Sequence, residues 1–261
     1  MAILHVAAGA HRPCHGRGMG YPRRMRSYII HMSKSTARRP NAERLLRDLP
    51  DAELVEAVDG RDPGQIADLV THPGDLFRPR YPFALRAPEV GVFASHRACW
   101  QRIVDSGEDC ALVVEDDLAV EPDRLAQALD MIAAQEVRGM YVRLPVKQRE
   151  RPARLLDEAG DMRLILPRVI GLQCIAQVVG RDAAQRLLHQ TGQIDRPVDT
   201  LLQMHWITGQ PVHAVLGTHN REVAPEIGGS TIQTKTPPGG KLRRELSRAW
   251  YRAQLQLRPQ D

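Results

Sequence analysis

The feature that most constrains the fold is the apolar run at residues 110–115, CALVVE, which ends in an acidic residue. A strand with one face in water alternates polar and apolar residues, whereas a continuous apolar run is typical of a strand covered on both faces. Such strands occur in parallel sheets, because the crossover helices cover both sides of the sheet. The run therefore predicts an α/β fold.

Strands and helices alternate along most of the chain, which has 261 residues and 43% hydrophobic content, enough for one large domain. Together with residues 110–115, the segments indicate a mostly parallel sheet flanked by helices in a single domain. Apolar runs predict strands at residues 28–31, 52–57, 140–144, 172–180 and 211–216, and helical spacing predicts helices at 35–49, 91–107, 123–136, 181–190 and 196–209.

The two ends differ from this central part. Residues 1–24 are rich in Gly, Pro, His and Arg without a sustained period, so we interpret them as a disordered leader or a start codon placed too early. The main domain is predicted at 25–236, followed by a basic amphipathic helix at 237–261. The four cysteines lack metal or disulfide spacing, and the N-terminus lacks a signal-peptide pattern, so we expect a cytoplasmic protein.

A net charge of +5 raises the alternative of a nucleic-acid-binding protein. The arginines are interleaved with acids, and aromatic residues for base stacking are only 4% of the chain, so we expect no nucleic-acid partner. Basic residues are enriched at 23–39 and 241–258, which favours a phosphate-bearing ligand or an acidic surface.

The basic C-terminal segment also carries an apolar stripe at helical spacing. Such a helix can lie on an anionic membrane, so we expect peripheral contact with the inner face of a membrane through residues 241–258. The alternative is a helix that closes the core or joins two subunits. The stripe consists of Leu242, Leu246, Ala249, Trp250, Ala253 and Leu257.

Three acids, Glu115, Asp116 and Asp117, follow the apolar run, where ligands collect in open α/β sheets. An extended backbone would direct Glu115 and Asp117 to one side and Asp116 to the other. Two carboxylates 4 Å apart repel by roughly 4 kcal/mol at an effective dielectric constant of 20, and a cation removes this cost. Oxygen ligands suit Mg²⁺ or Mn²⁺. The alternative is that the acids precede and stabilise the next helix.

The segment containing these acids resembles the central signature of glycosyltransferase family 25. The matching features are Gly91, a Ser-His pair at 95–96 that opens a helix with Trp100, and the strand that ends at 115–117. Further blocks agree in order, namely STARR, EAVDGR, GRDAAQRLL, RPVDTLLQ and PEIGGSTIQ, so that the resemblance covers residues 26–233.

The resemblance implies a GT-A type, Rossmann-like mixed sheet and an inverting transfer of a hexose, usually galactose from a UDP sugar, to a glycan acceptor in lipopolysaccharide or another surface polysaccharide. The acceptor could be lipid-linked. Glu115, Asp116 and Asp117 would hold Mn²⁺ or Mg²⁺. The candidate general base is Asp199 in RPVD, with Glu226 second; the alternative for Asp199 is a helix N-cap.

Other positions are expected to bind the donor. Ser95 could instead cap a helix, and His219, an additional candidate metal ligand, could instead be structural. The donor candidates are Ser33, Arg38 and Arg39 for the diphosphate, Asp59 and Gly60 for the uridine or ribose, and Ser95 and His96 for the pocket wall.

The sequence departs from the family pattern at two places. Residues 31–34, HMSK, replace the usual Asn-Leu-Asp-Arg, and residues 174–177, CIAQ, stand where an aromatic residue is common. A catalytically silent relative that binds nucleotide sugar or acts as a scaffold therefore remains an alternative to an active transferase.

Overall fold

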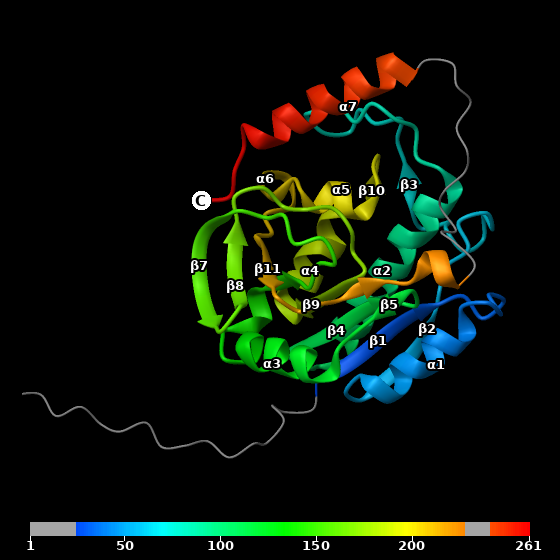
Figure 1. The fold of residues 1–261 in the computed structure, drawn as a ribbon. Coiled ribbons are helices and arrows are strands. Elements are labelled where there is room, and N and C mark those ends of the chain that lie inside the picture. The colour runs from blue at the N-terminus through cyan, green and yellow to red at the C-terminus, as the bar shows by residue number, and fades with distance from the viewer. Residues whose placement is uncertain (1–24, 228–240) are drawn as a thin grey trace, which may run out of the picture.

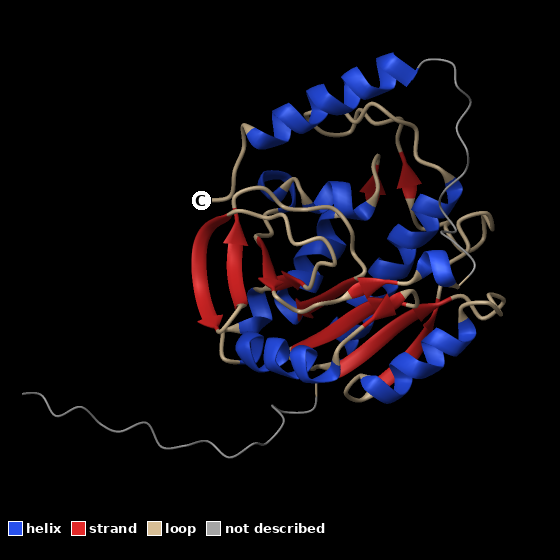
Figure 2. Ribbon diagram, viewed as in Figure 1, coloured by secondary structure: helices blue, strands red, loops and turns tan. Residues whose placement is uncertain are grey.

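The computed structural model describes residues 25–227 and 241–261, and most of their strands form one eight-stranded sheet (Figure 2). The 1–24 segment and the family-like block PEIGGSTIQ from residue 228 onward lie outside the described residues. In spatial order the strands are β2 (Ala52–Glu56), β1 (Arg26–His31), β4 (Cys110–Glu115), β9 (Ala176–Gly180), β6 (Tyr141–Arg143), β11 (Val212–Leu216), β8 (Met162–Pro167) and β7 (Pro152–Ala159).

The sheet is mixed. β1 pairs in parallel with both β2 and β4, and β6 pairs in parallel with β11. β9 runs antiparallel between β4 and β6, and β8 is antiparallel to both β11 and β7. The α/β class and the helix-flanked sheet predicted from the sequence are therefore confirmed, with a smaller parallel share than the apolar runs indicated.

Helices cover both faces of the sheet (Figure 1). Tyr28 and Val113 point toward α2 and α4, whereas the next residue of each strand, Ile29 or Val114, points toward α1 and α3. Because successive side chains of a strand point to opposite faces, the sheet has a hydrophobic core on each side. The helices are α1 (Arg39–Asp48), α2 (Ala87–Ser106), α3 (Pro122–Ala133), α4 (Arg181–Gln190), α5 (Val198–Leu202), α6 (His205–Thr208) and α7 (Lys241–Gln256), with short 3₁₀ turns η1 (Val137–Gly139) and η2 (Ala224–Glu226).

Two short two-stranded ladders lie beside the main sheet. β3 (Val70–Thr71) pairs in parallel with β10 (Gln193–Ile194), and β5 (Leu118–Ala119) pairs antiparallel with β12 (Arg221–Glu222). The second ladder brings the segment after β11 against the acidic end of β4, which matters for the site.

Two differences from the sequence-based prediction concern local patterns. The hairpin of β7 and β8 was not predicted, because most of β7 faces solvent and its apolar residues form no clear period. The single helix predicted at 196–209 is divided into α5 and α6, with a break at residues 203–204. Short helices of this length are stabilised by tertiary packing rather than by their own hydrogen bonds.

The start of α2 lies further upstream than the sequence indicated. Glu89 accepts the backbone N–H of Arg86, which caps a helix that begins at Ala87, and the helix ends at Gly107 with φ of 75°. Ser95 is therefore in the middle of α2 and does not cap it. Its hydroxyl donates to the Gly91 carbonyl and accepts the backbone N–H of Val58, at 2.8 and 2.9 Å.

The loop after β2 that contains residues 58–60, which we call the Val58 loop, contacts α2 where two glycines meet, Gly60 of the loop and Gly91 of the helix. A Cβ atom on Gly60 would lie 1.8 Å from the Ala87 carbonyl oxygen, and one on Gly91 would lie 2.6 Å from the backbone nitrogen of Gly60. Both contacts are with backbone atoms, which have little freedom to move. The Gly60–Gly91 contact therefore sets the distance between the loop and the helix.

Helix α7 packs on the rest of the chain through Tyr251 and Leu255, which are buried against Met204 and neighbouring aromatic residues. The described members of the predicted apolar stripe, from Leu246 onward, face outward, with Leu246 62%, Trp250 70% and Leu257 80% exposed. The helix thus closes part of the core with one face and leaves these residues of the stripe in solvent. Among the described residues no helix has the length and apolar character needed to span a membrane.

The Gly60 contact gives a direct test of the fold. We expect Gly60→Ala to lower the free energy of unfolding by about 2 kcal/mol or more, because the loop must move away from α2. Urea denaturation would measure the change. Gly139→Ala is the matched control, since its Cβ would meet no atom within 4 Å. Equal losses in the two variants would contradict the proposed constraint.

Candidate functional site: an acidic cavity at the ends of β1 and β4

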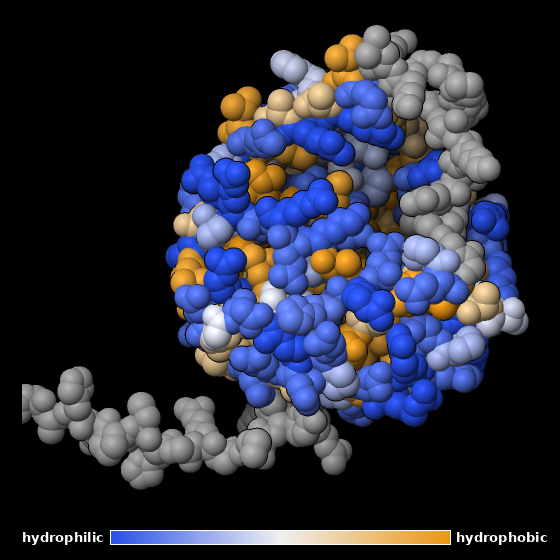
Figure 3. Space-filling model, viewed as in Figure 1, coloured by the Kyte–Doolittle hydropathy of each residue, from blue (hydrophilic) through white to orange (hydrophobic). Residues whose placement is uncertain are grey.

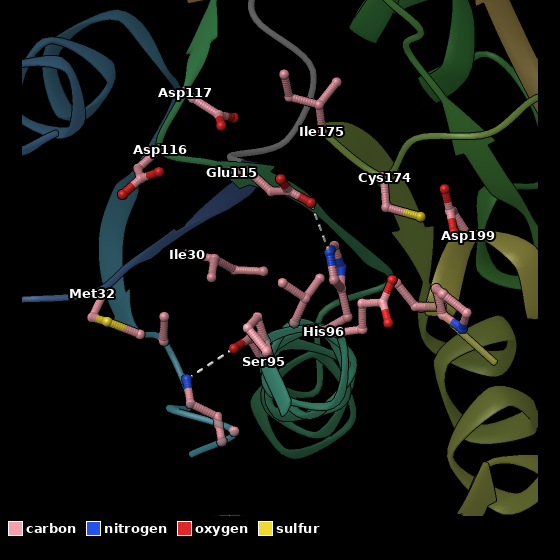
Figure 4. A pocket seen from close by; sticks show the side chains of 18 of the residues that line it. Ile30, Met32, Ser95, His96, Glu115, Asp116, Asp117, Cys174, Ile175 and Asp199 are labelled. Atoms are coloured by element: carbon pink, nitrogen blue, oxygen red, sulfur yellow. Dashed lines mark hydrogen bonds and ion pairs between the residues drawn. The ribbon is translucent and has the colours of Figure 1, made fainter. Parts of the chain in front are cut away.

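A cavity of about 620 Å³ lies beyond the carboxyl ends of β1 and β4, between the start of α1, the Val58 loop, α2 and α5 (Figure 4). Open α/β sheets bind ligands at this edge. The cavity brings together residues that are far apart in the sequence. Of the sequence-predicted site residues, its walls contain Arg38, Asp59, Gly60, Ser95, His96, Glu115, Asp116, Asp117 and Asp199.

Asp116 is held from two directions by basic side chains. His31 Nδ1 lies 2.8 Å from Asp116 Oδ2, and Arg38 Nη1 donates to Oδ1 at 2.6 Å. The amide of Asn41 in α1 also donates to the Asp116 carbonyl at 2.7 Å. Asp116 is buried, so these contacts tie α1 to the end of β4 and occupy both carboxylate oxygens.

Asp117 is only half satisfied. Arg38 Nη2 lies 3.0 Å from its Oδ2, whereas the buried Oδ1 has no hydrogen-bond partner. Burial, together with the neighbouring charges of Glu115, Asp116 and Glu222, raises the pKa of Asp117 to about 7, despite the opposing effect of Arg38. This carboxylate is therefore positioned to gain from a positive ligand.

The three acids do not alternate as an extended strand would. Glu115 is the last residue of β4 and points to the α2 face, but the chain turns directly afterward. Because of this turn, Asp116 and Asp117 both contact Arg38. The sequence-based expectation that Asp117 shares a side with Glu115 assumed a strand that continued beyond residue 115.

Glu115 is connected to a buried histidine. His96 Nε2 lies 3.3 Å from Glu115 Oε1, and the amide of Gln177 donates to His96 Nδ1 at 3.4 Å. A hydrogen bond received at Nδ1 leaves the ring proton on Nε2, facing Glu115. The Gln177–His96 pair therefore orients the Glu115 carboxylate into the cavity (Figure 4).

The fit of a metal ion can be judged from these groups. No cluster of three or more His, Cys, Asp or Glu side chains suited to a metal is found in residues 25–227 and 241–261. Asp117 Oδ1 is buried and unpaired, however, and Glu115 is 28% exposed beside it. Mg²⁺ and related ions are often bound by one or two carboxylates plus waters and substrate phosphates, so the residues fit an ion that arrives with a phosphorylated ligand.

The opposite wall carries Asp199. Its Oδ2 accepts the backbone N–H of Gln173 at 3.1 Å, and the Thr200 hydroxyl donates to Oδ1 at 3.2 Å. The Gln173 side chain donates to Glu222 at 3.1 Å, and Gln173 itself has φ of 77°, which is strained for a residue with a Cβ. Gln173 therefore links Asp199 to the acidic side of the cavity.

Several lining residues were missed by sequence reasoning. Gln173 gives no sequence signal, and Glu222 reaches the cavity only because β12 pairs with β5. Lys34 was quoted only as a departure from the family pattern, yet its amine forms an ion pair with Asp59. The Lys34 hydrogen bond and the Arg61 backbone N–H lower the pKa of Asp59.

The remaining predicted site residues lie outside the cavity walls. The structure places each of them in a separate polar contact. Ser33 donates to Glu56, Arg39 pairs with Glu43, Glu226 pairs with Arg221, and His219 lies between Glu121 and Asp161. His219 is thus not brought to the acidic cluster, because β12 directs Glu222 rather than His219 toward it.

Comparison with known proteins gives the class of this chain. The model of glycosyltransferase family 25 (LPS biosynthesis protein) matches residues 25–202, which include both walls of the cavity. The chain belongs to glycosyltransferase family 25.

Curated relatives agree with this assignment. The chain is 32% identical to procollagen galactosyltransferase 1 of Danio rerio over 67% of this chain and 30% of that protein. It is 34% identical to a glycosyltransferase 25 family member of Aedes aegypti over 40% of this chain and 18% of that protein. It is 32% identical to the probable inactive glycosyltransferase 25 family member 3 of Rattus norvegicus over 57% of this chain and 26% of that protein. The matches span less than a third of these relatives.

A solved structure of mannose-1-phosphate geranyltransferase from Thermus thermophilus aligns with 74% of this chain and 73% of its own at 15% identity. The TM-score of 0.32 is too low to support an argument about fold or function.

The raised pKa of Asp117 makes a prediction for stability. An unfolded aspartate has a pKa of about 3.9, so the folded state favours the protonated form, and its stabilisation is lost as the pH rises through about 7. We expect Asp117→Asn to be more stable than the native protein at pH 8, by about 2 kcal/mol, and equally stable near pH 4.

Chemical denaturation at both pH values would measure this difference, with Asp130→Asn, an exposed carboxylate of α3, as the control. Mn²⁺ should raise the melting temperature of the native protein more than that of Asp117→Asn. A variant less stable than the native protein at pH 8 would contradict the inferred electrostatic penalty.

Proposed function

We propose that this protein transfers a hexose from a nucleotide sugar to a hydroxyl group of a glycan acceptor, with inversion at the anomeric carbon. The observation that carries the proposal is a single cavity with an acidic cluster on one wall and Asp199 on the other. Membership of glycosyltransferase family 25 supports the reaction class.

Glu115 and Asp117 are the residues that would hold Mn²⁺ or Mg²⁺, since Asp116 is occupied by His31 and Arg38. When bound, such an ion offsets the negative charge that develops on the leaving diphosphate. Arg38 and Lys34 add positive charge on the same side of the cavity, which favours a diphosphate there. The Val58 loop, with Asp59 and Gly60, would contact the nucleoside.

Asp199 is the proposed general base. An inverting transfer needs a carboxylate that removes the proton from the acceptor hydroxyl on the face of the sugar opposite to the leaving group. The bonds from Gln173 and Thr200 fix the Asp199 carboxylate at the cavity wall. They account for one lone pair of each oxygen and leave acceptor capacity for a hydroxyl proton.

The proposed donor and acceptor are supported by the family and by the names of its relatives. One relative is named a procollagen galactosyltransferase and the family model is described by LPS biosynthesis, which supports a UDP-linked galactose and a surface glycan as the first substrates to test. A second candidate is a silent nucleotide-sugar-binding protein, because one relative is named as probably inactive.

We also propose that α7 contacts an anionic membrane on the side that supplies nucleotide sugars. Leu246 and Leu257 are exposed, and so are Arg248 and Arg252, which lie between them in the sequence. In Figure 3, orange hydrophobic surface appears at two places along the top of the molecule, where α7 lies, with paler surface between them and blue hydrophilic surface below. Leucines would enter the interface while the arginines meet lipid phosphates, as in amphipathic interfacial helices. This position suits a lipid-linked acceptor.

Release of UDP from UDP-galactose, and then from other nucleotide sugars, would test the reaction in the presence of Mn²⁺. We expect Asp117→Ala to lose at least about 10²-fold in turnover, because charge on the leaving group is no longer offset. Asp199→Asn should reduce transfer by about 10²- to 10⁴-fold through loss of the base while still binding donor.

Glu226→Gln is the control, since Glu226 is exposed and paired with Arg221 outside the cavity. Unchanged turnover in Asp117→Ala would refute the role of the acidic cluster. Donor binding measured by calorimetry without turnover of any nucleotide sugar would favour the silent relative.

Co-sedimentation with vesicles would test the membrane contact. We expect binding to vesicles of phosphatidylcholine and phosphatidylglycerol, weaker binding at high salt, and a loss of roughly tenfold or more in the double variant Leu246→Ser, Leu257→Ser. Leu155→Ser, an exposed leucine on β7, is the control. Equal binding by the two variants would exclude α7 as the contact.

A further inference from the structure

A second hollow lies between α7 and the loop at residues 73–84, and has a volume of about 680 Å³. We call it the α7 groove. Figure 1 shows α7 crossing above this loop, away from the central sheet. Its walls include Tyr81 and Phe83 from the loop and Trp250 from the helix. The groove is therefore lined by aromatic rings from two segments far apart in the sequence.

The α7 groove adjoins the acidic cavity. Tyr81 lines both, and Asp199 is among the other residues that line the cavity. Tyr81 also packs edge-to-face on Phe83 and on Tyr251, with centroids 5.5 and 5.6 Å apart. A ligand in the groove would therefore extend toward Asp199, the proposed base, rather than toward an unrelated surface.

A buried arginine contacts two of the aromatic residues that line the groove, Tyr81 and Tyr251. Arg196 forms a paired contact with Asp195 at 2.6 and 2.9 Å, and its Nη1 donates to the Tyr251 hydroxyl at 2.9 Å. Its guanidinium also lies within 6 Å of the Phe77, Tyr81 and Tyr251 rings. Arg196 immediately precedes the Pro197–Asp199 wall, so the same buried group positions the groove and the cavity wall.

The exposed rings and charges indicate the ligand. Trp250 is 70% exposed, and Phe83 is partly exposed with the Arg248 guanidinium 5.2 Å from its ring centroid. The C–H faces of hexose rings pack against aromatic faces, and sites of this kind combine aromatic walls with a few polar groups. Arg78 and Arg80, both exposed, line the groove and would meet a phosphate or carboxylate.

We propose that the α7 groove binds the acceptor as an anionic oligosaccharide, whose terminal sugar reaches the acidic cavity past Tyr81. The role as acceptor site rests on the proposed transferase function, whereas sugar binding itself does not. A lipid surface is the competing occupant. It is less favoured here because Trp250 lines a concave groove, whereas Leu246 and Leu257 lie on α7 outside it.

The test follows the indole N–H NMR signal of Trp250, which is identified by its absence in Trp250→Phe. Trehalose 6-phosphate is the probe, with trehalose, inorganic phosphate and anionic vesicles added separately. We expect a saturable shift with trehalose 6-phosphate, with a Kd on the order of 1 mM, and binding roughly fivefold weaker in the double variant Arg78→Ser, Arg80→Ser. Leu246→Ala is the matched control and should titrate like the native protein.

The titration contains no nucleotide sugar, so its result is independent of whether the donor is turned over. A shift with trehalose 6-phosphate in a protein that fails to release UDP would uphold the groove and refute only the transferase proposal. The proposal is overturned if the signal responds to vesicles but not to sugars, or if inorganic phosphate reproduces the whole shift. It is also overturned if the Arg78, Arg80 variant binds the probe like the native protein.

Discussion

The site depends on one buried ionic contact, in which Arg38 bridges Asp116 and Asp117 at the point where β4 ends. Removing two carboxylates from water costs several kcal/mol, and a guanidinium shared between them repays part of that cost. Arg38 precedes α1 directly, so the same contact fixes where the helix starts relative to the sheet. Arg38 leaves Asp117 Oδ1 unpaired, so a cation bound beside this oxygen would stabilise the site.

Around this contact, the two cores separate the roles of the acids. Glu115 points to the α2 face and is oriented by His96, whereas Asp116 points to the α1 face and is held by His31 and Arg38. The strand alternation that builds the two hydrophobic cores thus continues into the first two polar residues beyond them. The turn after Glu115 then returns Asp117 to the cavity, which makes Asp117 the acid with the least satisfied charge.

The sequence alone could predict the parts of the site that are local. The acidic triplet, the Ser-His pair and the Pro-Val-Asp block lie on or beside strands and helices that the spacing of apolar residues predicts. The edge of the sheet brings all three to one cavity. It could not predict contacts that depend on pairing between distant segments. Glu222 enters through the β5–β12 ladder, and Gln173 acts mainly through its backbone conformation, for which a glutamine gives no sign.

Residues that depart from the family pattern contact the acidic cluster and the cavity wall. His31 replaces a different family residue and holds Asp116, Lys34 pairs with Asp59, and Gln177 orients His96. These three positions within the changed stretches therefore each contact a residue that the family pattern retains. These changes preserve the acidic cluster and alter its supporting partners, so in the proposed transferase they would affect which donor fits rather than whether charge is concentrated there. Under the proposed transfer reaction, these supporting residues and the aromatic walls near Tyr81 are the positions that would set the choice of substrate.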